Sequence, residues 1–317
     1  MVAAMAEPLP SVLSLAQARD RGLTPTQWRS SNFDRVTRGV RRRGATATLA
    51  EQAAAFALVL PRPFAYSHMT AARLLELPLP GPVSSVGAHV EDSALDVIRP
   101  SASPRLTRAG VRGHRGLDRR RTTTVDGMPV VCVADTWVDL GELRGQAALS
   151  VDDLVVLGDE IAARLRLPTV PLIRAELGGA LGRRVRPRRA VDLRAALGLV
   201  RPGVRSPMES RSRLMFVHAL LPEPEVNGVL RDETGQWLME CDLVWRGQRV
   251  VAEYQGQPHA NLRARSQDAA KRRLAEDYGW KVHEIFAADV YTRPRRIDLL
   301  RRIAADLRLP PDTLRIQ

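Results

Sequence analysis

Residues 239–256 read MECDLVWRGQRVVAEYQG, and this stretch decides the fold of the C-terminal part of the chain. It has the pattern of two short strands joined by a turn at 246–247. The second strand, 249–254, is rich in valine and ends before a glycine. Asp242 stands on the first strand and Glu253 near the end of the second. A hairpin of this kind predicts that the two carboxylates meet over an otherwise apolar sheet.

Such a carboxylate pair indicates a divalent cation. Two carboxylates in apolar surroundings repel each other and are costly to desolvate unless a cation or a proton lies between them. Oxygen ligands on a rigid sheet suit Mg²⁺ or Mn²⁺. Gln255 is expected on the same face as Glu253, because side chains two apart on a strand point the same way. A structural salt bridge from Asp242 to Arg249 or Arg272 is the alternative interpretation.

The same residues carry a resemblance to a known family. An Asp followed on the next strand by Glu-x-Gln resembles the PD-(D/E)XK nuclease superfamily, and residues 253–259, EYQGQPH, resemble its branch of very-short-patch-repair (Vsr-like) endonucleases. Two further stretches fit that pattern: 206–211, SPMESR, which opens a helix, and 268–282, in which a helix leads into a strand. The resemblance covers residues 205–306 and departs at Gln255, where the superfamily often has lysine.

The resemblance implies a restriction-endonuclease-like mixed sheet flanked by helices over 206–317, and metal-dependent cleavage of DNA. The residues that it makes catalytic are Glu209, Asp242, Glu253, Gln255 and His259, with Mg²⁺ or Mn²⁺ held by Asp242, Glu253 and Glu209. Glu209 also fits a helix-capping box that begins at Ser206, and capping is the alternative role for it. An exposed loop position is the alternative for His259, and Lys271 is a candidate replacement for the missing lysine.

The charge of the chain is positive and unevenly placed. The 317 residues carry 48 Lys and Arg against 35 Asp and Glu, a formal net charge of +13. Residues 205–317 hold 19 basic and 16 acidic side chains, so residues 1–204 hold 29 and 19. An excess of this size favours polyanions such as nucleic acid, and its location predicts that the front part of the chain holds DNA.

Residues 1–46 have the pattern of a winged helix-turn-helix module. Apolar spacing predicts a first helix over 11–21, a capping box predicts a second from Thr24, and 33–43 reads as a basic hairpin, or wing. The stretch 11–44 resembles the N-terminal winged helix of the type IV abortive-infection (AbiEi-type) antitoxin family, which implies DNA binding. A small helical module with a solvated charged edge is the alternative. The residues expected to contact DNA are Arg35, Arg38, Arg41, Arg42 and Arg43 in the wing and Lys271 and Arg272 in the C-terminal part.

The middle of the chain predicts mixed α/β structure over 47–165 and an Arg- and Pro-rich linker over 166–205, with helical pieces near 171–180 and 190–197. Residues 101–121 contain seven arginines and one aspartate, which indicates either a solvated loop or contact with phosphates. His68 stands beside a helix cap, where a structural role is expected. The strands expected here are 84–90, 94–98, 111–114 and 130–133, and the helices 135–141 and 151–165.

Two functions from different classes therefore stay open. The first is a metal-dependent endonuclease; the second is a DNA-binding, antitoxin-like regulator whose nuclease-fold domain is inactive, and a repair or RNA-processing nuclease is a weaker third. Gln255 favours the regulator, and the convergence of the three carboxylates favours the enzyme. A partner toxin and a homodimer both remain open.

Neither a metal-binding cysteine framework nor a membrane segment is expected from the sequence. Cys132 and Cys241 lack the spacing of zinc ligands and are expected in the core. No leader pattern opens the chain and no apolar run approaches eighteen residues, so we expect a cytoplasmic protein that does not enter a membrane.

Overall fold

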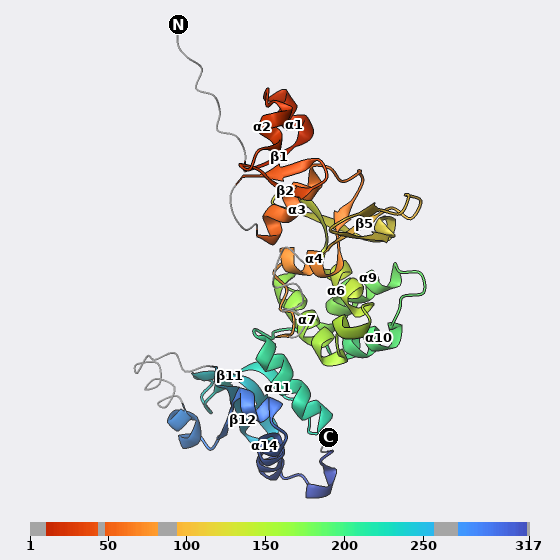
Figure 1. Ribbon diagram of the computed structural model, residues 1–317. Helices are drawn as coiled ribbons and strands as arrows, with labels where there is room; N and C mark the ends of the chain where they lie inside the picture. The colour runs from red at the N-terminus through yellow and green to blue at the C-terminus, as the bar shows by residue number, and fades with distance from the viewer. Residues whose placement is uncertain (1–10, 44–47, 82–93, 257–271, 316–317) are drawn as a thin grey trace. The chain divides into compact units, whose positions relative to one another are not determined.

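The structure is a computed structural model and is a mixed α+β fold. It describes residues 11–43, 48–81, 94–256 and 272–315. These divide into an N-terminal unit, 1–149 with 177–193, and a C-terminal unit, 150–176 with 194–317 (Figure 1). In the part of the chain so described, no helix has both the length and the apolar character needed to cross a membrane.

The first part of the N-terminal unit holds two short helices and a three-stranded antiparallel sheet in the order β1-β3-β2. The hairpin expected over 33–43 is confirmed. Leu13, Ala18, Trp28 and Phe33 form the small core beneath it. The elements are β1 (Val12–Ser14), α1 (Leu15–Asp20), α2 (Pro25–Arg29), β2 (Asp34–Thr37) and β3 (Val40–Arg42).

The first helix begins later than the sequence predicts. Residues 12–14 form β1, and α1 starts at Leu15 because Ser14 is its N-cap. The Ser14 hydroxyl accepts a hydrogen bond from the Gln17 N–H at 3.2 Å, and the Gln17 side chain accepts one from the Ser14 N–H at 2.9 Å. A capping box of this kind holds the cap residue in an extended conformation. The predicted capping box at Thr24 is present.

The rest of the N-terminal unit is built on a six-stranded sheet in the order β6-β7-β5-β4-β9-β8. Three of the expected strands are confirmed within a few residues, and the fourth, 84–90, lies outside the described residues. The strands are β4 (Ala65–Tyr66), β5 (Leu95–Arg99), β6 (Thr107–Arg108), β7 (Val111–Arg115), β8 (Thr122–Val125) and β9 (Met128–Val131). Helix α3 (Leu49–Ala57) precedes the strands, α4 (His68–Leu74) lies between β4 and β5, and α6 (Val133–Gly141) follows β9.

The stretch 166–205 contains the helical pieces expected near 171–180 and 190–197, but it packs into the fold and does not form an open linker. Apolar residues at helical spacing lie between its arginines and prolines, and Leu177, Ala180, Leu193 and Ala196 are buried. The elements are α7 (Val151–Arg164) before it, then α8 (Val170–Ile173), a π-helical turn (Arg174–Gly178), α9 (Gly179–Gly182) and α10 (Ala190–Leu199).

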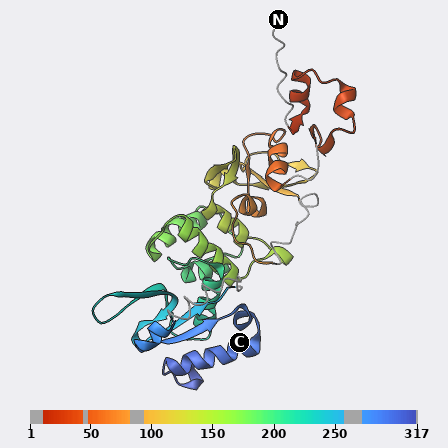
Figure 2. The same cartoon turned by 90° about the vertical axis from the view of Figure 1, so that its left-hand side faces the viewer.

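The C-terminal unit contains the expected mixed sheet, in the order β10-β11-β12-β13. The first two neighbouring pairs are antiparallel and the last is parallel. The elements are α11 (Pro207–His218), β10 (Glu225–Arg231), β11 (Trp237–Trp245), β12 (Val250–Tyr254), β13 (Lys281–Ile285), α13 (Ala287–Tyr291) and α14 (Arg293–Asp306). Figure 2 shows the β10–β11 hairpin projecting past the shorter strands.

Two apolar clusters cover the two faces of this sheet. On one face, side chains of α11 and α14 pack with Leu243 and Ala252, and on the other face Cys241 packs with Val244 and Val251. Along a regular strand, Cys241 and Leu243 would share a face. Their separation shows that β11 changes its alternation at Asp242, and this irregularity positions the candidate site.

A substitution at Gly158, in the middle of α7, tests how closely this helix packs against Val200, the residue after α10. A Cβ at Gly158 would lie 2.4 Å from Val200 Cγ2, whereas a Cβ at Gly198 meets nothing within 4 Å. In an exposed helix, Gly→Ala stabilises by roughly 0.5–1 kcal/mol. We expect Gly158→Ala to lower the unfolding free energy by about 1–3 kcal/mol through overpacking, and Gly198→Ala to leave it equal or higher. Urea unfolding measures both; a stabilised Gly158→Ala would contradict the packing.

Candidate functional site

The N-terminus of α11 is capped by Ser206, which leaves Glu209 for another role. The Ser206 hydroxyl accepts a hydrogen bond from the Glu209 N–H at 3.2 Å, and Pro207 occupies the first turn. The Glu209 carboxylate turns away from the cap. Its Oε2 accepts hydrogen bonds from the Arg205 N–H at 3.0 Å and from the Asn227 side-chain amide at 2.8 Å. Glu209 is only 7% exposed, so a buried carboxylate lies at the start of this helix.

Asp242 lies where β11 and β12 separate. The pairing of the two strands ends at Leu243 and Ala252, and beyond it the Oδ2 atom of Asp242 accepts a hydrogen bond from the Tyr254 N–H at 2.8 Å. A side-chain oxygen has thus replaced the backbone acceptor of a regular ladder. The Asp242 carboxylate is therefore held at the opening between two strands, in a half-buried position.

Glu209 and Asp242 interact electrostatically. Burial raises the pKa of Asp242 above its ordinary value, the Tyr254 N–H lowers it, and the negative charge of Glu209 raises it again. The Arg205 guanidinium opposes this effect only in part, because it forms an ion pair with Glu240 at 2.7 Å. Among the residues that the structure describes, no hydrogen bond is recorded to Glu209 Oε1 or to Asp242 Oδ1. These two oxygens are the candidate metal ligands.

Glu253 is on the other face of the sheet, so the expected set of three carboxylates is not assembled. Its side chain hydrogen-bonds with the thiol of Cys241, and burial followed by the Glu253 charge raises the pKa of that thiol. Glu253 follows Val251 by two residues and shares its face, whereas Asp242 interacts with Glu209 on α11. Within the described ranges, no group of three or more His, Cys, Asp or Glu side chains is arranged to hold a metal ion.

The alternative salt bridge of Asp242 is not formed. Arg272 instead pairs with Glu276 at 3.0 Å and Glu284 at 3.5 Å, and Arg249 donates to the Tyr278 carbonyl at 3.3 Å.

The remaining predicted residues of this site contribute less. The Gln255 N–H donates to the Ile285 carbonyl at 2.7 Å, so its backbone extends the β12–β13 pairing. His259 and Lys271 lie outside the described residues.

Two site residues could not be found by motif reasoning. Asn227 has a left-handed backbone, φ 49°, opposite the irregular part of β11, and its amide orients Glu209. Asparagine tolerates this conformation better than most residues, and the Asn227-Gly228 pair was the available signal. Arg205 comes directly before the capping motif that begins at Ser206. Its guanidinium is the only positive charge among the main causes that shift the pKa of Asp242.

The arginines of the wing divide into exposed and structural residues. Arg35 and Arg38 are exposed and line a cavity of 310 Å³ next to Trp28. Arg41 is committed within the module, because it donates to the Phe33 carbonyl at 2.8 Å and lies 5.8 Å from the centre of the Trp28 ring.

Of the other two wing arginines, Arg43 lies over the Phe33 ring at 5.9 Å, and Arg42 has a buried Nε. Arg35 and Arg38 are thus the wing residues best placed to meet a phosphate backbone.

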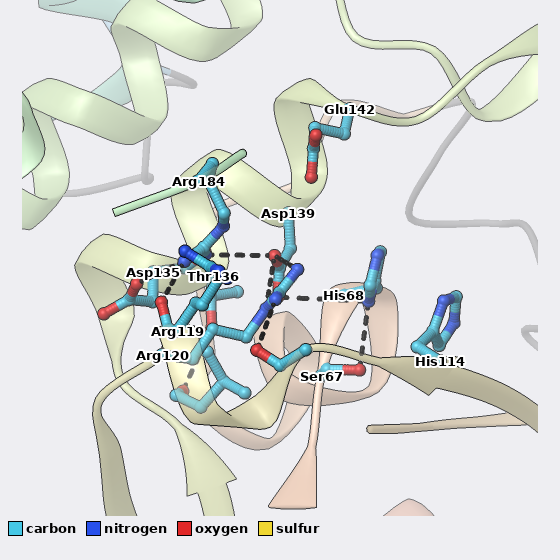
Figure 3. A network of polar contacts seen from close by, with 12 residues as sticks. Ser67, His68, His114, Arg119, Arg120, Asp135, Thr136, Asp139, Glu142 and Arg184 are labelled. Carbon is cyan, nitrogen blue, oxygen red and sulfur yellow. Dashed lines mark hydrogen bonds and ion pairs between the residues drawn. The ribbon is translucent and has the colours of Figure 1, made fainter. Parts of the chain in front are cut away.

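The N-terminal unit also contains a buried polar network that sequence reasoning missed (Figure 3). Asp135 and Asp139 of α6 are fully buried, four residues apart on one helix. Arg184 binds both, at 2.8 and 3.2 Å, and Arg120 binds Asp139 at 2.7 Å. Because these charges are paired inside the protein, Arg120 does not belong to the solvated or phosphate-binding loop predicted over 101–121.

His68 belongs to the same region and is structural rather than catalytic in its contacts. Its ring stacks on His114 with centroids 3.8 Å apart, and its Nδ1 lies 3.0 Å from the Ser67 hydroxyl (Figure 3). Burial and the neighbouring His114 hold the pKa of His68 well below its ordinary value. His68 is therefore a neutral, packed ring at neutral pH.

Comparison with known proteins supplies relatives without an assigned activity. The chain is similar to "Uncharacterized protein Rv2248" of Mycobacterium tuberculosis strain ATCC 25618 / H37Rv and to "Uncharacterized protein MT2308" of strain CDC 1551 / Oshkosh. Each is 28% identical over 216 residues, 68% of this chain and 74% of the relative. No family model and no solved structure matches the chain. The function is therefore argued from the site.

The raised pKa of Asp242 predicts how removing its charge changes the stability of the fold at different pH values. A carboxyl whose pKa is higher in the folded state destabilises the fold once it ionises, with full effect above the raised pKa. Asn at 242 removes the charge and keeps an oxygen acceptor for Tyr254. We expect Asp242→Asn, in EDTA at pH 7, to unfold at an equal or higher denaturant concentration, and the difference to vanish as pH falls below the ordinary value of 3.8.

The matched control is Asp232→Asn in the turn of the same sheet. Hydrogen bonds from Thr234 lower the pKa of Asp232, so its charge stabilises the fold at neutral pH and its removal should destabilise. A loss of stability in Asp242→Asn at pH 7 would instead place Asp242 in a stabilising ion pair.

Proposed function

We propose that this protein binds DNA through its N-terminal unit and cleaves phosphodiester bonds with a divalent metal ion in its C-terminal unit. The observation that carries the proposal is the electrostatic interaction of two carboxylates, the buried Glu209 and the half-buried Asp242, where β11 and β12 separate. The mixed sheet with α11 against one face agrees with the resemblance to the PD-(D/E)XK superfamily in residues 205–306.

The donor set fits Mg²⁺ or Mn²⁺. Magnesium is usually held by one or two carboxylates and completes its shell with water and substrate phosphates, so a pair of carboxylates suffices. Burial is the main cause of the raised pKa of Asp242, and a cation between Glu209 and Asp242 would also remove the repulsion that adds to it. When bound, such an ion lowers the pKa of a water molecule and neutralises charge on the reacting phosphate.

The protein's own groups then position the reactants. The Tyr254 N–H and the Asn227 amide fix one oxygen of each carboxylate, which orients the other oxygens. Arg205 is an exposed cation beside the pair and is placed to meet a phosphate that approaches it. Gln255 follows Glu253 by two residues on a continuing strand and shares its face, so it has no role at the pair in this proposal, and the assistance expected from His259 stays a prediction.

A second function, a DNA-binding regulator without catalysis, is favoured by one specific observation. Glu253, the acidic residue of the motif, contacts Cys241 on the other face of the sheet. Together with Gln255 in the usual lysine position, this arrangement is what an inactive nuclease fold would show. The two functions share the DNA-binding unit and differ in cleavage.

For DNA binding, the exposed and structural wing arginines should behave differently. We expect the double change Arg35→Gln and Arg38→Gln to weaken binding to duplexes of unrelated sequence alike, because phosphate contacts carry no base information. If both arginines meet phosphates, the slope of log K against log salt should fall in magnitude by about 2. Fluorescence anisotropy at several salt concentrations measures this.

Arg41→Gln is the contrasting variant in the same hairpin. It removes the hydrogen bond to the Phe33 carbonyl and the contact with Trp28, so it should lower the melting temperature of the protein. Unchanged DNA binding in the Arg35 and Arg38 variant would refute the assignment of the wing as the interface.

Metal-dependent cleavage decides between the two functions. With Mg²⁺ or Mn²⁺ we expect nicking of plasmid DNA that EDTA abolishes, and a loss of about 10²–10³-fold in Asp242→Asn and in Glu209→Gln, by analogy with removing one electrostatic group from an active site. Glu233→Gln, an exposed carboxylate in the β10–β11 turn, is the control that should cleave at the wild-type rate.

If the wild type cuts nothing with either ion, the regulator is the correct function. Gln255→Lys should then gain no cleavage, because residue 255 shares the face of Glu253 and not that of the carboxylate pair.

A further inference from the structure

A second concave site lies in the C-terminal unit, away from the carboxylate pair. It is a cavity of 280 Å³ lined by residues of α7, α11, α13 and α14 together with Arg315 near the end of the chain. We propose that this cavity, the C-terminal pocket, binds a nucleotide, with the arginines on its phosphate and Tyr291 beside its base. The proposal is independent of the carboxylate site and of metal-dependent cleavage.

Three guanidinium groups converge on the C-terminal pocket from separate segments of the chain. Arg211 comes from α11, Arg296 from α14, and Arg315 from the segment after α14. Guanidinium groups bind phosphate with paired hydrogen bonds and keep their charge at every physiological pH. Three arginines brought to one hollow from distant parts of the sequence are therefore typical of an anion site.

Two of these arginines are held in place by contacts within the unit. Arg211 pairs with Asp153 at 2.7 Å, and the Arg296 guanidinium donates to the Val290 carbonyl at 3.2 Å. The Arg211 guanidinium has five N–H donors, more than its contact with Asp153 uses. These contacts restrict the side chains before a ligand arrives, which reduces the entropy lost on binding.

One acidic residue, Asp152, lines the pocket, and its carboxylate contacts His218, which lines the same pocket. Its Oδ1 lies 2.8 Å from His218 Nε2, with both side chains on the rim. The imidazole N–H is the donor in this contact, so the carboxylate fixes the orientation of the ring. With Asp153 paired to Arg211 also counted, three arginines stand against two aspartates, so the site keeps a net positive charge and favours an anion.

The other end of the pocket suits a planar base. Met215, Val290 and Leu300 supply an apolar floor, and the Tyr291 side chain is 61% exposed at the same cavity. The Tyr291 hydroxyl contacts the Met208 sulfur at 3.5 Å, which holds the ring at the rim. An exposed aromatic ring beside an apolar floor is a stacking surface for a nucleobase. Inorganic phosphate alone would leave this half of the pocket unused.

The size of the pocket indicates one nucleotide rather than a duplex. Its 280 Å³ lies near the lower end of ligand sites, about 300–1,000 Å³. Glu209 and His218 are nine residues apart on α11, so the two sites are separated by about 13 Å along the helix. A free mononucleotide and the 5′-terminal nucleotide of a DNA strand offer the same chemistry, and the experiment distinguishes them.

The test measures binding to the full chain by isothermal titration calorimetry. The probes are AMP, adenosine, inorganic phosphate, and a short single-stranded oligonucleotide with and without a 5′-phosphate. We expect AMP to bind at least tenfold more tightly than either adenosine or phosphate. If the natural ligand is a strand end, the 5′-phosphorylated oligonucleotide should bind more tightly than AMP; if it is a free nucleotide, AMP should bind more tightly.

Point variants then assign the binding to the C-terminal pocket. Arg296→Gln and Arg315→Gln should each raise the dissociation constant of AMP at least tenfold, and Tyr291→Ala should weaken AMP but not inorganic phosphate. Arg301→Gln, which removes an exposed arginine from the same helix as Arg296 outside the pocket, should bind AMP like the wild type. Melting temperatures identify any variant that has lost its fold.

Three results would overturn the proposal: no AMP binding by the wild type at millimolar concentration, wild-type affinity in both Arg296→Gln and Arg315→Gln, or an equal loss in Arg301→Gln. Asp242→Asn separates this proposal from the nuclease, because it should abolish cleavage and leave AMP binding unchanged.

Discussion

The C-terminal unit depends on one buried ion pair, between Arg213 of α11 and Asp159 of α7. Both side chains are inaccessible to solvent and lie 3.1 Å apart. Arg213 also binds Glu223 at 2.7 Å and the Leu199 carbonyl at 2.8 Å, and Asp159 also accepts a hydrogen bond from the Ser210 hydroxyl at 2.7 Å. Breaking such a pair by removing one partner costs about 3–5 kcal/mol, because the other charge is left buried alone.

The pair matters for function because it fixes α11. Glu209 is the residue before Ser210, so the contact between Ser210 and Asp159 sets the rotation of the helix and the direction of its first turn. That rotation places the Glu209 carboxylate against Asn227 and near Asp242. The opposite end of the same helix carries His218 into the C-terminal pocket. One rigid helix thus positions both candidate sites.

Local patterns in the sequence predicted much of the fold and part of the site. The capping box at Thr24, the wing hairpin and the two strands around 246–247 depend on neighbouring residues, and all are present. The helical pieces expected near 171–180 and 190–197 are also present, but the composition of 166–205 did not show that the stretch packs into the fold and is no open linker.

Long-range geometry accounts for the rest of the site. The sequence places Asp242 opposite Glu253, but the change of alternation in β11 and the left-handed backbone of Asn227 turn Asp242 toward Glu209. Arg213 and Asp159 are 54 positions apart, and Arg184 and Asp135 are 49 positions apart. Local sequence patterns therefore do not predict these ion pairs.

The central claim is that Glu209 and Asp242 together bind one divalent ion, and a titration with Mn²⁺ followed by electron paramagnetic resonance tests it most directly. The account predicts one bound Mn²⁺ per chain that Mg²⁺ displaces, with a dissociation constant at least tenfold higher in both Glu209→Gln and Asp242→Asn. A wild-type protein that binds no more Mn²⁺ than the variant lacking both carboxylates would contradict it.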